Sequence, residues 1–133
     1  MALDKSTIGA RIREAIELEG AGDKALAIKR LRELNDEIPD QPSVKTYLGS
    51  FLTSEGSFDE AIKHAAASVK LAGHSELASL TLFHALWAAG YEDQAIDEAN
   101  RFQKLKHSDD YEEILAAWNS AKSRNRGKGN SRA

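Results

Sequence analysis

Residues 48–69, LGSFLTSEGSFDEAIKHAAASV, decide the fold of this 133-residue chain. Apolar residues recur at helical spacing on both sides of Gly56, for example Leu52 before it and Ala61 and Ala65 after it. A helix commonly ends at a residue with a left-handed backbone, which glycine adopts without strain. The small Ala61 fits a close helix crossing, because a larger side chain would push the two helix axes apart. The stretch therefore predicts two helices joined by a tight turn at Gly56.

This unit occurs three times at a fixed interval. Gly22, Gly56 and Gly90 are 34 residues apart, and each is followed five and six positions later by Ala-Ile. A period of this length is typical of stacked units that bury their apolar faces on one another. We therefore expect one domain in which the stacked units together present a binding surface.

The pattern resembles the tetratricopeptide repeat (TPR) family, whose units of about 34 residues follow the form W-x2-L-G-x2-Y, then Gly, then A-x3-F, then Pro. The matching residues are Leu18, Gly22, Ala27, Leu31, Leu34 and Pro39 in the first unit, Leu48, Gly49, Leu52, Gly56, Phe58, Ala61, Ala65 and Leu71 in the second, and Leu82, Leu86, Gly90, Ala95, Ala99, Phe102 and Leu105 in the third. The resemblance spans residues 8–107 and implies an all-α fold, an α-α superhelix of helical hairpins. Another array of helical hairpins is the alternative.

The chain departs from the family pattern at several positions. Lys45 and Ser79 stand at the Trp position, and Phe83 replaces the Gly of Leu-Gly in the third unit. In the first unit Glu14 falls on an expected core position. The first helix is therefore either shifted by one residue or an atypical end cap.

The helical patterns divide the chain into three hairpins and one further helix. Helices are expected near residues 7–20, 23–37, 43–55, 58–72, 75–89, 92–106 and 110–122. We predict a repeat domain over residues 1–122, with units at about 8–41, 42–75 and 76–109 and a cap at 110–122 that covers the last hairpin. Ser75 is placed to cap the fifth helix, and Asp109 with Glu112 gives the seventh an acidic start.

The end of the chain differs in composition from the repeats. Residues 123–133 contain no apolar run that offsets the entropy of ordering them, so we expect a disordered basic tail. Residues 1–121 hold 13 basic and 21 acidic residues, a net charge of −8. A basic tail can contact phosphate or an acidic partner, but the acidic body argues against nucleic acid as the main ligand.

Composition and motifs argue against an enzyme. The chain has no cysteine, so a disulfide framework, a thiolate metal site and a thiol nucleophile are excluded. The histidines His64, His74, His84 and His107 lie on different helices and loops and form no known catalytic motif, and we expect neither a metal nor a cofactor. The N-terminus lacks a basic stretch followed by an apolar run, and no apolar segment approaches a membrane span. We expect a cytoplasmic protein without a small-molecule substrate or a membrane partner.

In TPR proteins the first helix of each hairpin lines a concave groove. The resemblance projects the groove onto Ile12, Ile16, Glu19, Thr46, Ser50, Thr53, Leu80, His84, Trp87, Tyr111, Ile114 and Trp118. This groove is small and polar in its middle and aromatic toward its C-terminal end. Some TPR proteins hold the C-terminal carboxylate of a chaperone through Lys and Asn on these helices. Here the corresponding positions hold Ile12 and Ile16, Thr46 and Ser50, and Leu80 and His84, so that clamp is absent.

An aromatic groove suits an apolar or amphipathic protein segment, and the acidic body favours one with basic residues. Trp87 and Trp118 are either anchors for such a partner or core residues packed between the sixth and seventh helices. We expect a noncatalytic protein-interaction module, an adaptor or a client-holding chaperone. Self-association as a structural or assembly protein and a toxin-neutralising, immunity-type role are the alternatives.

Overall fold

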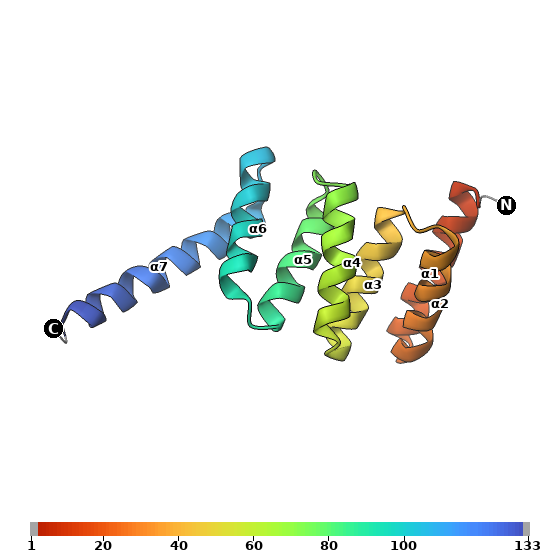
Figure 1. Cartoon of the computed structure of the whole chain (residues 1–133), viewed down its shortest axis with the longest axis horizontal. Helices are drawn as coiled ribbons and strands as arrows, with labels where there is room; N and C mark the ends of the chain where they lie inside the picture. The colour runs from red at the N-terminus through yellow and green to blue at the C-terminus, as the bar shows by residue number, and fades with distance from the viewer. Residues whose placement is uncertain (1–2, 132–133) are drawn as a thin grey trace.

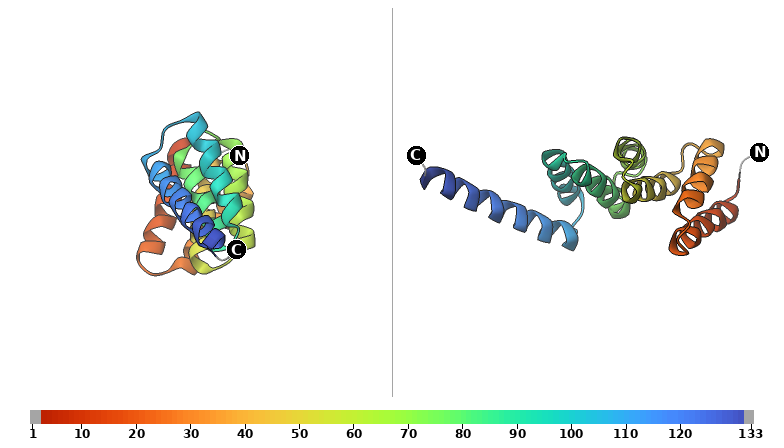
Figure 2. Two further views of the ribbon diagram at one scale, coloured as in Figure 1. Left: turned by 90° about the vertical axis from the view of Figure 1, so that its left-hand side faces the viewer. Right: turned by 90° about the horizontal axis from the view of Figure 1, so that it is seen from below.

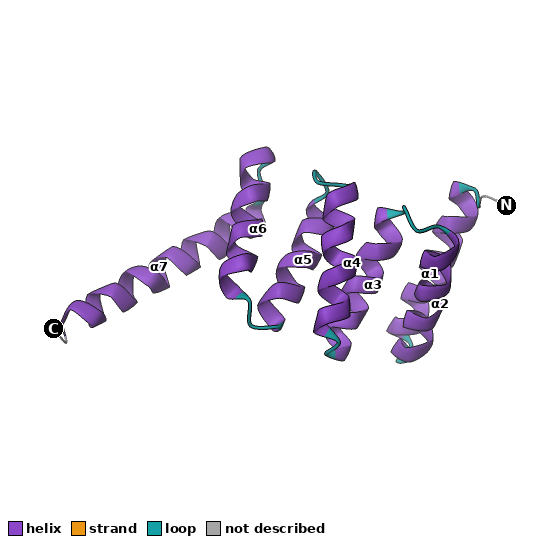
Figure 3. Cartoon of the chain, in the orientation of Figure 1, coloured by secondary structure: helices purple, strands orange, loops and turns teal. Residues whose placement is uncertain are grey.

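The computed structural model describes residues 3–131, and every regular element in that range is an α-helix (Figure 3). The helices are α1 (Lys5–Gly20), α2 (Lys24–Glu37), α3 (Pro42–Glu55), α4 (Phe58–Leu71), α5 (Glu76–Ala88), α6 (Glu92–Leu105) and α7 (Asp109–Ser131). The predicted all-α fold is confirmed, and the first six helices begin and end within two residues of the positions expected from the sequence. None of the helices described between residues 3 and 131 is long and apolar enough to cross a membrane.

Consecutive helices pair as hairpins, α1 with α2, α3 with α4 and α5 with α6, and the hairpins stack in chain order (Figure 1). The first helices of neighbouring hairpins also contact one another, α1 with α3 and α3 with α5. The right-hand view in Figure 2 shows the resulting elongated stack, with α7 continuing beyond its C-terminal end. The first helices therefore form a continuous layer, to which the predicted groove residues of the three hairpins belong.

The three repeat glycines reverse the chain between the helices of each hairpin. Gly22, Gly56 and Gly90 have φ angles of 92°, 91° and 91°, in the left-handed region. At the second turn the Gly56 amide donates to the Thr53 carbonyl, which satisfies one of the open acceptors at the end of α3. The turn role predicted for these glycines is confirmed.

The second hairpin is held together by an unusually close helix crossing. A Cβ atom added to Gly49 on α3 would lie 3.3 Å from the Ala61 carbonyl oxygen and 3.3 Å from the Ala65 Cβ of α4. Ala61 and Ala65 are both fully buried. Small residues on both helices therefore allow the backbones of α3 and α4 to meet, as the alanine pattern predicted.

The apolar core runs through the stack in two clusters that are linked by Ile62, which packs against both. One polar pair is buried between α3 and α4. The Ser68 hydroxyl donates to the Pro42 carbonyl at 3.0 Å, and the Thr46 and Ser68 hydroxyl oxygens lie 2.5 Å apart. Because the Ser68 proton points at Pro42, Thr46 is the donor in this second bond.

The seventh helix is longer than the sequence predicted. It was expected to end near residue 122 and to be followed by a disordered tail over 123–133, but α7 continues to Ser131. That expectation is wrong for residues 123–131, and residues 132 and 133 lie outside the described part of the chain. The composition of residues 123–133 indicates only that they have few apolar side chains to bury, and it does not exclude a helix. A helix that has already formed extends by one hydrogen bond per residue, no proline interrupts it, and basic residues near its C-terminus are favourable.

Gly49→Leu is expected to destabilise the protein by about 1–3 kcal/mol, because the new side chain must push α3 and α4 apart. Gly20 provides a matched control, since a Cβ atom added there would meet no atom within 4 Å. Gly20→Leu should leave stability unchanged or raise it slightly. Chemical denaturation followed by circular dichroism measures both variants, and equal midpoints would contradict the close crossing.

Candidate functional site

Two rows of the predicted groove residues lie at the surface of the first helices. One row stands six residues before each turn glycine and is exposed in all three hairpins. The other stands three residues before the glycine and is partly or well exposed. The first row consists of Ile16, Ser50 and His84, and the second of Glu19, Thr53 and Trp87. Both rows are therefore accessible to a partner on the first-helix layer.

The third row, ten residues before each turn glycine, lies in the interior. Ile12 is 9% exposed and Thr46 is 4% exposed, while Leu80 is half-buried against the C-terminal core cluster. Tyr111, which was also expected in the groove, is fully buried. The groove prediction is wrong for Ile12, Thr46 and Tyr111. Ile12 belongs to the N-terminal core cluster, Thr46 is buried against Ser68 of α4, and Tyr111 of α7 packs on the last hairpin.

A small polar pocket of about 220 Å³ lies between α3 and α5. It is lined by Ser50, Thr53, Ser54, Thr81 and His84. Three of its hydroxyls donate to carbonyls of their own helices, at 2.8 Å for Thr53, 3.0 Å for Ser54 and 2.8 Å for Thr81. Their oxygens keep acceptor capacity toward the pocket. The predicted polar middle of the groove corresponds to this pocket.

A larger pocket of about 630 Å³ opens where α7 diverges from α5 and α6. Its lining is mainly apolar and aromatic, and consists of Phe83, His84, Trp87, Glu92, Ile96, Ile114, Ala117, Trp118, Ala121 and Asn125. His84 lines both pockets, so the two adjoin. Four of the predicted residues, His84, Trp87, Ile114 and Trp118, are thus brought together, whereas Ile16, Glu19 and Leu80 line neither pocket.

The aromatic side chains form a continuous wall in the larger pocket. Phe83 stacks on Trp87 with ring centroids 5.7 Å apart, and Trp87 meets Trp118 edge to face at 5.8 Å. Trp87 remains 40% exposed, and the Lys122 ammonium lies 5.1 Å from the centre of a Trp118 ring. The two tryptophans therefore contact each other and also line the pocket. Each is at once a packed residue and part of the pocket wall.

Several residues of the larger pocket were not predicted from the sequence. Ala117, Ala121 and Asn125 continue the face of α7 on which Ile114 and Trp118 lie, and the helical spacing of three and four residues was the available signal. Glu92 and Ile96 belong to α6, a second helix of a hairpin, and they line the pocket only because α7 tilts away. No pattern in the sequence indicates that Glu92 and Ile96 line a pocket.

The start of α7 is fixed to the last hairpin by a buried polar network. The Ser79 hydroxyl donates to the Glu98 carboxylate at 2.6 Å, and the Tyr111 hydroxyl lies 2.7 Å from Ser79 Oγ and donates to it. Arg101 holds the same carboxylate with two hydrogen bonds, at 2.8 and 2.6 Å. Glu98 is 7% exposed, so these partners compensate the loss of its hydration. Burial raises the pKa of Tyr111, which keeps its donor proton in place.

The cap of α7 adds a second attachment to α5. The Ser108 hydroxyl accepts from the Tyr111 amide at 3.2 Å and donates to the Glu76 carboxylate at 3.0 Å. Ser108 thus caps α7, while Asp109 and Glu112 supply the predicted acidic first turn. The position of Ser75 as a cap is confirmed, since its hydroxyl accepts from the Ala78 amide at 3.1 Å.

One exposed cluster brings a histidine and two carboxylates together outside the pockets. His107 Nε2 lies 2.7 Å from Asp109 Oδ1 and 3.5 Å from Glu112 Oε2. The hydrogen bond to Asp109 and the nearby charges raise the pKa of His107. Since negative charge at a helix N-terminus is favourable by itself, the cluster is explained by the start of α7.

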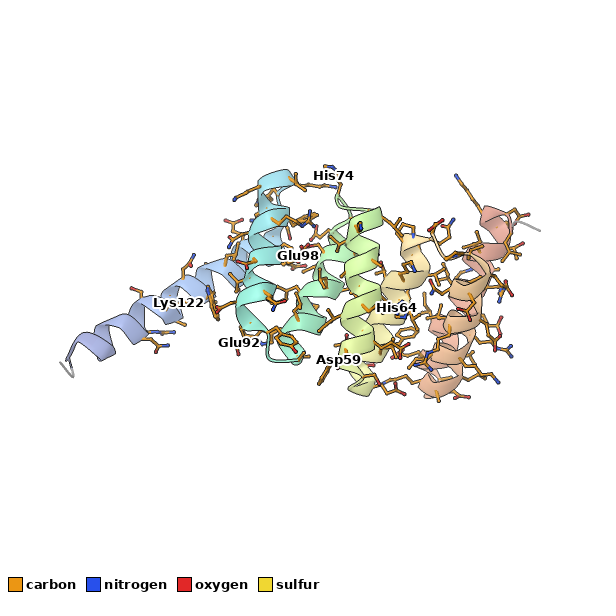
Figure 4. All side chains as sticks on the ribbon, in the orientation of Figure 1. Asp59, His64, His74, Glu92, Glu98 and Lys122 are labelled. Carbon is orange, nitrogen blue, oxygen red and sulfur yellow. The ribbon has the colours of Figure 1, made fainter. Side chains whose placement is uncertain are left out.

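Few ionisable side chains line the two pockets. Among the described residues that line them, the ionisable side chains are His84 and Glu92. The hydroxyl protons of Thr53, Ser54 and Thr81 point to backbone carbonyls instead of to a base, so these groups are not activated nucleophiles. Figure 4 shows Glu92, which lines the larger pocket, at the start of α6, and Lys122 on α7.

Comparison with solved structures shows the fold of the chain. It is similar to a structure described as the first TPR of Spaghetti (RPAP3) bound to HSP90 peptide SRMEEVD, with a TM-score of 0.78 and 17% identity, over 91% of this chain and 99% of that one. It is also similar to an O-GlcNAc transferase mutant from Thermobaculum terrenum, with a TM-score of 0.71 and 21% identity, over 80% of this chain but 20% of that one. No family model and no curated protein matches the sequence. The chain therefore has the TPR fold that its repeat pattern predicted.

Tyr111→Phe is expected to destabilise the protein by about 1 kcal/mol, because it removes the hydrogen bond to Ser79 inside the network. The attachment of α7 should loosen, so hydrogen exchange of the α7 amides should accelerate. Tyr91 is 47% exposed, and Tyr91→Phe is the matched control with no expected effect. Unchanged exchange in Tyr111→Phe would contradict the anchoring role of the network.

His107 and His64 are expected to titrate on opposite sides of 6.5, the ordinary histidine pKa. Asp109 raises the pKa of His107, so its protonation contributes stability that is complete below pH 6.5 and is lost as the pH rises through the raised pKa. Burial lowers the pKa of His64, so its contribution is lost as the pH falls below 6.5. NMR titration of the ring protons measures both, and Asp109→Asn should lower the pKa of His107. A His107 pKa at or below 6.5 in the unaltered protein contradicts this assignment.

Proposed function

We propose that this protein is a noncatalytic interaction module that holds an apolar or amphipathic segment of another protein in the groove formed by the two adjoining pockets. Trp87 is the principal anchor, with Ile114 and Trp118 on the facing wall. The observation that carries the proposal is the larger pocket with its partly exposed aromatic wall. Aromatic side chains contribute most per residue at protein interfaces, and exposed ones in a cleft commonly mark such a site.

The size and character of the groove support a segment of secondary structure as the occupant. A pocket of about 630 Å³ with an apolar wall accommodates several large side chains from one face of a helix. The adjoining polar pocket offers hydroxyl oxygens and His84, which can accept hydrogen bonds from polar side chains or from peptide N–H groups. Anchors of two kinds, apolar and polar, therefore lie side by side.

The partner is proposed to carry basic residues beside its apolar face. The chain up to residue 121 has a net charge of −8, and Glu92 lies in the larger pocket itself. Such complementarity mainly accelerates encounter and excludes acidic competitors. The neighbour with the RPAP3 domain is described with the peptide SRMEEVD, whose acidic residues do not suit this groove.

The biological role that we favour is that of a cytoplasmic adaptor or client-holding chaperone. A toxin-neutralising, immunity-type role uses the same groove with one dedicated partner, and is the second candidate. Both roles require tight recognition by the aromatic wall, and they differ in the number of clients that the groove accepts.

Trp87→Ala is expected to weaken client binding at least about tenfold, because a central aromatic anchor typically contributes about 2 kcal/mol or more. The protein is used to capture partners from its host, and the captured segment is then synthesised and titrated by calorimetry. Leu71→Ala is the matched control, since Leu71 is 46% exposed on α4 and lines neither pocket.

The proposal fails if the synthesised segment binds Trp87→Ala and the unaltered protein equally well. Loss of binding in both Trp87→Ala and Leu71→Ala would also count against it, since the effect would then not be specific to the groove. Circular dichroism first establishes that the three proteins are equally helical.

A further inference from the structure

We propose that the chain self-associates through α7, which pairs antiparallel with α7 of a second copy around Trp118. The occupant that we propose for the apolar face of α7 is a second copy of this chain. The inference goes beyond the proposed function and is tested without any client.

An apolar face runs along the part of α7 that leaves the hairpins. It consists of Ile114, Ala117, Trp118 and Ala121, which follow one another at the spacing of one side of a helix. Ala117 is exposed and Ala121 is partly buried, while Ile114 and Trp118 pack with one side against the last hairpin and remain partly accessible. The face therefore offers a seam for another helix, with Trp118 near its centre.

The charges of α7 are divided on either side of this centre. Its first five residues contain four carboxylates, from Asp109 to Glu113, whereas Lys122, Arg124, Arg126 and Lys128 follow Trp118 without any acidic residue. A parallel partner would place like charges together at both ends. An antiparallel second copy places the acidic half of each helix against the basic half of the other.

The flanking charges also lie on the correct side of the helix. Glu113 and Arg124 are eleven residues apart, which is about 20° more than three full turns of an α-helix. They consequently flank the same edge of the apolar face. Glu113 is five residues before Trp118 and Arg124 is six after it, so a twofold axis near Trp118 brings Glu113 of one copy opposite Arg124 of the other.

The position of α7 makes this pairing sterically accessible. Figures 1 and 2 show α7 extending away from the stack, so its outer half is not covered by its own hairpins. The partner helix would enter the opening beside Glu92, which adds another carboxylate near its basic half. Because one helix pair buries a small area, we expect a dissociation constant on the order of 10 µM for the dimer.

Purified full-length protein is examined by sedimentation velocity over a range of concentrations. The mass should rise from 14.6 kDa toward twice that value. Ala117→Glu should weaken association at least about tenfold, because it places a charge in the seam. Ala116→Glu is the matched control, since Ala116 is also exposed. Around the helix axis Ala116 lies about 160° from Trp118, the centre of the seam, and so points away from the partner. It should associate as the unaltered protein does.

Charge reversal tests the antiparallel register. Glu113→Lys and Arg124→Glu should each weaken association several-fold, since each creates two like-charge contacts. An equimolar mixture of the two variants, and the double variant carrying both changes, should regain it. A mass of 14.6 kDa at every concentration up to about 1 mM overturns the proposal. Association that is insensitive to Ala117→Glu, or that the mixture fails to restore, overturns it as well.

These outcomes are independent of the client experiment. Failure to self-associate leaves the effect of Trp87→Ala on client binding unaltered, and absence of a client leaves the mass measurement unaltered. If both interactions occur they compete, because the α7 face belongs to the wall of the larger pocket.

Discussion

The left-handed glycine between the helices of each hairpin is the constraint on which the architecture depends. With φ near 91° at Gly22, Gly56 and Gly90, the chain reverses at the same register in every unit. The residues three and six positions before each glycine consequently appear on the same layer in all three hairpins. A repeated backbone conformation thus produces a continuous surface, whose chemistry is then set by the side chains at those positions.

The buried carboxylate of Glu98 determines how that surface ends. Ser79 of α5, Arg101 of α6 and, through Ser79, Tyr111 of α7 all depend on it, so the three helices are joined by one polar network. A fully apolar contact at this place would tolerate sliding, whereas directed hydrogen bonds fix the start of α7. The helix leaves the stack from that fixed point, and the larger pocket is the space left between it and the last hairpin.

The repeat pattern predicted the hairpins, their turns and most helix bounds, because 34-residue spacing and helical periodicity are local properties of the sequence. It was less accurate for the groove. Ile12 and Thr46 lie at the edge of a helical face, and a neighbouring helix covers that edge, which spacing within one helix does not reveal. Glu92 and Ile96 enter the site through the tilt of α7, a tertiary feature. The length of α7 was missed because composition measures the capacity for burial and not the propagation of an existing helix.

The position of the two tryptophans has a consequence for how this protein unfolds. Trp87 and Trp118 are the only tryptophans in the sequence, and they contact each other at the C-terminal end of the stack. Hairpins in a solenoid interact mainly with their neighbours, so unfolding can proceed from one end. Indole emission then reports on the last hairpin and α7 alone, whereas the far-ultraviolet signal reports on every helix. If unfolding begins at α1, the far-ultraviolet signal will change before the indole emission does. Comparison of the two transitions therefore shows from which end the chain unfolds.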